Sequence, residues 1–160
     1  MHRLLDRGTQ GPGTALGGSR ARPVLLATLA VRVDREAERI AVASALETGV
    51  KLILASMIAM PRYPLTVMLA RDYATLPHEE DLDAVRATAN RSASLGIATE
   101  LLRVSSPRPL KALIELVRER DPGLLVFGPD RSRTPRWRFW QAARMVRRDA
   151  PCLVWIAGGG

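Results

Sequence analysis

The chain has 160 residues, 47% of them hydrophobic and 25% charged, a composition typical of one globular domain with its own core. No apolar run approaches the roughly 18 residues of a membrane-spanning helix, and the N-terminal stretch lacks the apolar segment of a secretory signal. The single cysteine excludes an internal disulfide and the two isolated histidines exclude a Cys/His metal cluster, so we expect a cytoplasmic protein.

The formal net charge of +8 is unevenly distributed along the chain. Residues 1–23 carry four arginines and one aspartate and are rich in small and polar residues without periodicity, which predicts a disordered basic tail. Residues 24–130 are close to neutral, whereas residues 131–148 contain seven arginines and no acid. The excess positive charge of the globular part therefore lies in this second segment.

The first predicted strand covers residues 24–33, an apolar run rich in Val and Leu. Asp34 then caps a helix that has acids in its first turn, where the helix dipole favours them, and Gly49 ends it. Residues 50–60 form a second predicted strand, and residues 61–78 a long irregular connection.

The second half of the chain continues this alternation of strands and helices. Pro109 suits the first position of a helix because no N–H donor is needed there. The predicted elements are a helix over 78–95, a strand over 97–104, a helix from Pro109 to about Asp121, and strands over 124–127 and 152–156. The alternation predicts a parallel sheet with helices on both faces, whose ligands bind at the carboxyl ends of the strands.

The arginine-rich segment 131–148 precedes the last strand and has the length of a helix. Trp137, Trp140, Ala143 and Val146 recur every three residues, and we interpret them as the stripe that covers the sheet. The solvated side of the helix would then carry Arg136, Arg144, Arg147 and Arg148.

Three stretches of the second half resemble the universal stress protein family, the UspA-like branch of the nucleotide-binding α/β folds. They are SLGIATELLRVSSPRPLKALIELVRERDPGLLVFG (Ser94 to Gly128), the basic loop and helix that follow, and RRDAPCLVWIA (Arg147 to Ala157). The last is similar to the family's HAPCPVLVV ending. The resemblance implies a three-layer αβα sandwich over residues 24–157, with a five-stranded parallel sheet in the order 3-2-1-4-5. The three glycines at 158–160 predict a frayed end.

The resemblance also implies a homodimer, often formed by antiparallel pairing of the last strands. An apolar edge strand that stays unpaired promotes aggregation, so we predict that dimerisation covers it. The predicted interface residues are Cys152, Leu153, Val154, Trp155 and Ile156.

Many members of the family hold ATP or AMP at a loop signalled by Gly-x2-Gly-x9-Gly-Ser/Thr. Its first glycine corresponds to Gly128, but the other positions fall on Arg131, Gln141 and Ala142. Two of these add side chains where a phosphate must approach bare backbone, and Ala142 offers no hydroxyl. Pro129 removes a further N–H donor from the loop.

We therefore predict a regulatory or interaction protein, not an enzyme, that serves an unknown protein partner and does not bind ATP in the standard way. One alternative is that ATP or AMP binds through arginine side chains, with Gly128, Arg131, Arg133 and Asp34 around it. The family usually places an Asp just after the first strand. This position falls on Leu29 when the strand is aligned and near Asp34 when the following helix is aligned, so we interpret Asp34 first as a helix cap. A second alternative is contact of segment 131–148 with nucleic acid or an anionic membrane surface. No G-x-S-x-G elbow or catalytic triad pattern points to hydrolysis.

Overall fold

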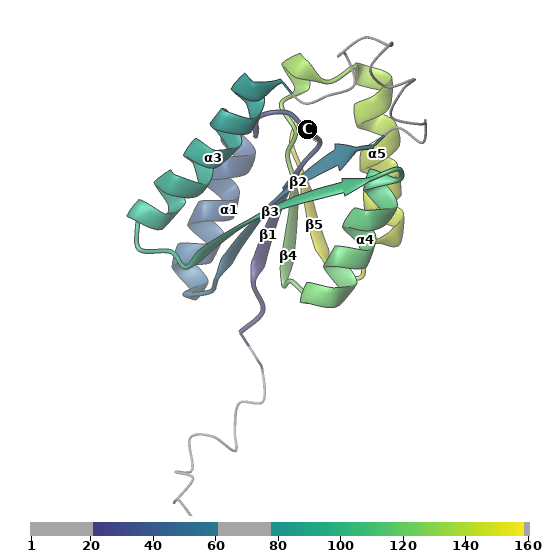
Figure 1. Cartoon of the computed structure of the whole chain (residues 1–160). Helices are drawn as coiled ribbons and strands as arrows, with labels where there is room; N and C mark the ends of the chain where they lie inside the picture. The colour runs from purple at the N-terminus through teal and green to yellow at the C-terminus, as the bar shows by residue number, and fades with distance from the viewer. Residues whose placement is uncertain (1–20, 61–77, 159–160) are drawn as a thin grey trace, which may run out of the picture.

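The computed structural model describes residues 21–60 and 78–158, which form one parallel sheet covered by helices on both faces (Figure 1). The five strands lie in the order β3-β2-β1-β4-β5, which confirms the predicted fold class. In chain order the elements are β1 (Val24–Thr28), α1 (Arg35–Thr48), β2 (Leu52–Ala59), α3 (Glu79–Ser94), β3 (Thr99–Ser106), α4 (Pro109–Arg120), β4 (Leu124–Phe127), the 3-10 helix η3 (Arg131–Arg133), α5 (Arg136–Asp149) and β5 (Leu153–Ile156).

Several sequence predictions concern residues outside these ranges. The disordered tail was predicted over residues 1–23, of which 1–20 lie outside the described residues, as do 61–77 of the predicted irregular connection. Residues 159–160 of the predicted frayed end also lie outside them. Gly158 is described, and its carbonyl accepts a hydrogen bond from Arg131 Nη1 at 3.2 Å.

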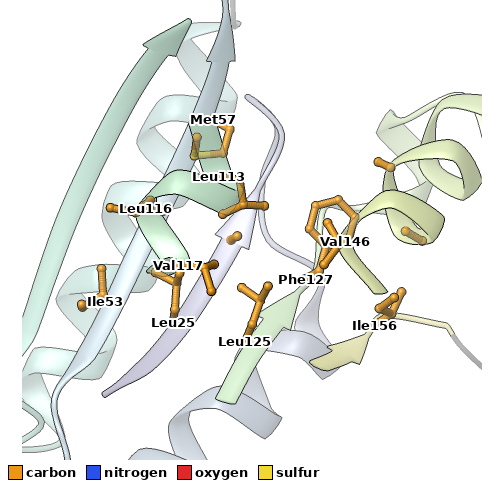
Figure 2. Close-up of a cluster of buried hydrophobic side chains, with 14 of the residues drawn as sticks. Leu25, Ile53, Met57, Leu113, Leu116, Val117, Leu125, Phe127, Val146 and Ile156 are labelled. Carbon is orange, nitrogen blue, oxygen red and sulfur yellow. The ribbon is translucent and has the colours of Figure 1, made fainter. Parts of the chain in front are cut away.

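Helices α1 and α3 cover one face of the sheet, and α4 and α5 cover the other (Figure 1). On the first face the alanine stripe of α1 lets the helix lie close to the strands. On the second face Leu25 and Phe127 from the sheet pack against Leu113 of α4 and Val146 of α5 (Figure 2). The central strand β1 is buried along its whole length, as its continuous apolar run predicts.

The first strand ends earlier than predicted, at Thr28 instead of residue 33. Ala30 has a φ of 49°, in the left-handed region that side chains rarely adopt, so the chain turns away from the sheet there. The Thr28 hydroxyl donates a hydrogen bond to the Val31 carbonyl at 2.7 Å and closes this turn. The third strand is shifted by two residues relative to the prediction, to Thr99–Ser106.

The predicted sheet-facing stripe of α5 is wrong for both tryptophans. Trp137 is 67% exposed and Trp140 is 42% exposed, whereas Phe139 is 1% exposed. The buried stripe is Phe139, Ala142, Ala143 and Val146. These residues follow the i, i+3, i+4, i+7 spacing of a real helix turn, and the two alanines bring α5 close to the sheet, where indole rings would not fit.

Candidate functional site

A pocket of about 770 Å³ opens at the carboxyl ends of the strands. Its walls come from the β1–α1 connection, the end of β2, the starts of α3 and α4, η3 and the first turns of α5. Since β1 lies between β2 and β4, the connections leaving β1 and β4 pass to opposite faces of the sheet. This is the switch point at which α/β folds bind ligands, so the pocket is the candidate site.

The connections after β1 and β4 are joined to each other by backbone hydrogen bonds. The Asp34 N–H donates to the Gly128 carbonyl at 2.9 Å, and the Asp130 N–H donates to the Arg32 carbonyl at 3.0 Å. Val33 and Pro129 form an antiparallel bridge between these two bonds. The two connections therefore form one small ladder, which fixes the floor of the loop that would face a phosphate.

Gly128 is explained by helix packing rather than by a ligand. A Cβ atom at this position would lie 2.1 Å from Ala37 Cβ, so only glycine lets α1 approach the end of β4. The Gly128 N–H donates to the Ala27 carbonyl at 2.9 Å and continues the pairing of β1 with β4. The backbone N–H of this predicted site residue is therefore already used within the sheet.

Asp34 acts as the helix cap that its sequence context indicates. Its Oδ1 accepts hydrogen bonds from the N–H groups of Glu36 at 2.9 Å and Ala37 at 3.2 Å. These bonds satisfy two of the open donors at the start of α1. The carboxylate is therefore engaged by its own helix.

Asp130 places a carboxylate inside the loop that follows β4. Its Oδ1 accepts a hydrogen bond from the Ser132 N–H at 2.9 Å and another from the Ser132 hydroxyl at 2.7 Å. The side chain takes a backbone donor of the kind that a phosphate would use, and it brings negative charge. Asp130 was not predicted as a site residue, although Asp followed two residues later by Ser is a common capping pattern.

Arg131 lies against α5. Its guanidinium carbon is 5.1 Å from the centroid of the Phe139 ring and 5.5 Å from that of Trp140. Its Nη1 also donates to the Gly158 carbonyl, so the side chain ties the loop to the segment after β5. The structure therefore separates Arg131 from the other predicted ligand, Arg133, which lines the pocket.

Arg133 is bound to Asp81 at the start of α3. Arg133 Nη2 and Nε donate to Asp81 Oδ2 at 2.8 and 3.1 Å, while the backbone N–H and Nε of Arg32 donate to Oδ1 at 3.2 and 3.3 Å. Asp81 is 1% exposed. Its burial disfavours the charged form, but the hydrogen bonds from Arg133 and Arg32 outweigh burial and lower the pKa of Asp81 below its ordinary value.

Asp81 and Arg32 were not predicted as site residues. The sequence places Asp81 in the first turn of a helix, where acids are common because the helix dipole stabilises them, so its presence there indicates no site. Its partners are 49 and 52 residues away in the chain, so no local pattern indicates the ion pair.

The helix starts around the pocket differ in charge. The first turns of α1 and α3 contain acids, whereas those of α4 and α5 contain none. The positive ends of the α4 and α5 dipoles are therefore not compensated by their own side chains. Arg138 adds a cation to the pocket wall that takes part in no ion pair within residues 21–60 and 78–158. The pocket thus combines apolar walls with positive potential on the α4 and α5 side, which suits a small ligand bearing negative charge.

The last strand forms one edge of the sheet. β5 pairs only with β4 in the described sheet, and Leu153 at its start is 71% exposed. Cys152 is half-buried against the core, and this burial raises the pKa of its thiol, which disfavours the reactive thiolate. No group of metal-binding side chains and no helix capable of crossing a membrane occurs among the described residues.

The sequence matches the universal stress protein family over residues 21–158, and no curated protein matches significantly. A solved family protein from Burkholderia pseudomallei is 21% identical with a TM-score of 0.59, and the alignment covers 87% of this chain and 97% of that one. A universal stress protein in complex with cAMP is 22% identical, with a TM-score of 0.59 and coverages of 87% and 98%. The Archaeoglobus fulgidus universal stress protein in complex with dAMP is 19% identical, with a TM-score of 0.57 and coverages of 84% and 96%. At these identities the likeness concerns the fold.

Proposed function

Because this chain belongs to the universal stress protein family, we propose that it is a regulatory, non-catalytic member whose switch-point loop does not hold ATP. The observation that carries this proposal is the Asp130 carboxylate, which accepts the Ser132 N–H at 2.9 Å inside that loop. A triphosphate at the loop would have to displace a bonded carboxylate and would meet its negative charge. The loop residues Gly128 and Pro129 add no open N–H donor, since one is paired with Ala27 and the other has none.

Calorimetric titration of the full chain with ATP tests this proposal directly. We expect an ATP dissociation constant no tighter than about the millimolar range, equivalent to about −4 kcal/mol. Asp130→Ala frees the Ser132 N–H and removes the charge, so it should strengthen ATP binding, and Asp130→Asn should do so less. Asp83→Asn, which removes an exposed charge elsewhere, serves as the control and should change nothing. Micromolar binding of ATP to the unchanged chain contradicts the proposal.

A second candidate function is binding of an adenine nucleotide with a single phosphate in the same pocket. The supporting observation is Arg138, which lines the pocket together with the acid-free first turns of α4 and α5. The volume of about 770 Å³ lies within the range of roughly 300–1,000 Å³ usual for small-molecule sites. Family structures hold cAMP and dAMP, so such a ligand is a reasonable probe. The anion would be held by an arginine side chain instead of a glycine loop.

Thermal-shift and calorimetric titrations with AMP and cAMP separate this candidate from the first. Arg138→Gln should weaken AMP binding about tenfold or more, since a charge-assisted hydrogen bond contributes about 1.5–3 kcal/mol. Arg136→Gln removes an arginine from the same helix turn that does not line the pocket and should have little effect. Equal losses in both variants, or no response to AMP at millimolar concentration, contradict the second candidate.

A further inference from the structure

Helix α5 presents a basic and aromatic surface that its role in the core does not explain. Trp137, Trp140, Arg144 and Arg147, which we call the α5 outer face, are all exposed and follow the i, i+3, i+7, i+10 spacing of one helix side. They extend over about 15 Å at 1.5 Å per residue. The segment 131–148 contains no acid, and neither arginine of this face takes part in an ion pair within the described residues.

Both tryptophan rings lie against neighbouring side chains. The Trp140 ring meets Phe139 edge-on, with centroids 5.6 Å apart and an interplanar angle of 86°, and Arg131 lies 5.5 Å from its centroid. The Arg138 guanidinium lies 5.6 Å from the centroid of the Trp137 ring. Rings that already contact their neighbours lose less conformational entropy when a partner stacks on them than rings without such contacts.

The composition of this face distinguishes between polyanionic partners. A helix that lies on a membrane inserts an apolar face, but the apolar face of α5 is packed on the sheet through Phe139 and Val146. An acidic protein segment would pair with the arginines but would not need two exposed rings. A single-stranded nucleic acid matches both features, since its bases stack on aromatic rings and its phosphates pair with arginine.

We propose that the α5 outer face binds single-stranded nucleic acid, with bases stacked on Trp137 and Trp140 and phosphates paired with Arg144 and Arg147. This surface is separate from the proposed pocket function, except that Trp137 also lies at the pocket wall and contacts Arg138, which the pocket proposal uses. Trp140, Arg144 and Arg147 do not line the pocket, so variants at these three positions test the surface alone.

Fluorescence anisotropy of a labelled oligothymidylate, titrated with the full chain at several salt concentrations, tests the proposal. Trp140→Ala should weaken binding about tenfold, the loss expected for one stacked base. The double variant Arg144→Gln/Arg147→Gln should reduce the slope of log affinity against log salt by about 1.4, or about 0.7 for each phosphate that is no longer paired with an arginine. The double variant Arg35→Gln/Arg39→Gln, which removes two exposed arginines from α1, should leave affinity and slope nearly unchanged.

Several results would overturn the proposal. The first is no anisotropy change at low salt. The second is a loss of affinity in the α1 control as large as that in the α5 variants. The third is an affinity for anionic vesicles, duplex DNA or polyglutamate equal to that for the oligothymidylate. Circular dichroism checks that each variant is folded, and because the two arginines are solvent-exposed, their double variant keeps the test valid if Trp140→Ala unfolds. AMP titration of the same variants should be unaffected, so a failure here is distinguishable from a failure of the pocket function.

Discussion

Arg133 Nη2 lies 2.8 Å from Asp81 Oδ2, which joins the loop after β4 to the start of α3 across 52 residues of sequence. Asp81 is almost completely buried and also accepts hydrogen bonds from Arg32 of the β1–α1 connection. One carboxylate therefore holds three separate segments at the carboxyl edge of the sheet. Since Arg133 and Asp81 both line the pocket, the fold itself fixes part of the pocket wall.

Replacing Asp81 by Asn should destabilise the protein. The carboxamide keeps one acceptor oxygen but loses the negative charge, and its NH2 group would face one of the two arginines in a buried position. Breaking a fully buried ion pair costs about 3–5 kcal/mol. Because the Arg32 and Arg133 side chains are 34% and 31% exposed, water compensates in part, and we expect about 1–3 kcal/mol in urea denaturation. Asp83→Asn removes an exposed acid from the same helix and should cost less than about 0.5 kcal/mol. Equal effects of the two substitutions would contradict the role assigned to Asp81.

The contribution of Asp81 to the stability of the fold should decrease as the pH falls. Its pKa in the folded protein is lowered from the ordinary value of 3.8, so the unfolded chain takes up the proton first as the pH falls. The stabilisation is complete well above pH 3.8 and is lost as the pH falls through the lower pKa of the folded state. The difference in unfolding free energy between the unchanged chain and Asp81→Asn should therefore be constant near neutral pH and shrink below about pH 3.8. A difference that grows in acid would contradict this assignment.

Gly128→Ala should destabilise the protein through a clash with α1. The new Cβ would lie 2.1 Å from Ala37 Cβ, which is attached directly to the helix backbone and cannot rotate away. Overpacking of this kind costs about 1–3 kcal/mol, measurable by thermal or urea denaturation. Ala37→Gly in the same chain should recover part of the loss, although glycine inside a helix itself costs about 1 kcal/mol. Gly123→Ala, whose Cβ would meet its nearest neighbour at 3.4 Å, is the matched control and should be nearly neutral.

In α5, replacing a buried aromatic residue should destabilise the protein more than replacing an exposed one. Phe139→Ala removes a ring that packs against Phe127 with centroids 6.1 Å apart, and it should cost about 3–5 kcal/mol. Trp137→Ala removes a larger ring that is 67% exposed and should cost less than about 1 kcal/mol. Urea denaturation of both variants checks this order. A greater loss of stability for Trp137→Ala than for Phe139→Ala would contradict this assignment and support the predicted stripe in which Trp137 faces the sheet.

The exposed edge of β5 leads to a prediction about assembly, which we propose to be a homodimer paired through this strand. Leu153 is 71% exposed on a strand with one described neighbour, and such an edge favours pairing with a second strand. Leu153→Lys should shift the protein towards the monomer in light scattering at micromolar concentration. Leu46→Lys replaces an exposed leucine of α1 and should leave the assembly unchanged. A monomer before any substitution would contradict the proposal.

Much of the fold was predictable because its signals are local. The structure confirms three predicted helix ends: Asp34 caps α1, the left-handed Gly49 ends α1, and Pro109 lies in the first turn of α4. The α5 register was not predictable in this way, since a three-residue and a four-residue spacing both occur among its apolar residues. Packing decided it, because alanines and Phe139 fill the space against the sheet while the indole rings do not.

The sequence by itself determined the order of strands and helices, the parallel sheet and the departure of the loop from the glycine pattern. The first two follow from periodicity and caps that act within a few positions, and the third from setting the loop against the pattern of the family that the sequence resembles. Only the tertiary structure decided what the loop residues do. It placed Arg131 on α5, Arg133 on Asp81 and Gly128 beneath Ala37, because hydrogen bonds and close contacts between segments distant in the chain depend on how the sheet brings them together.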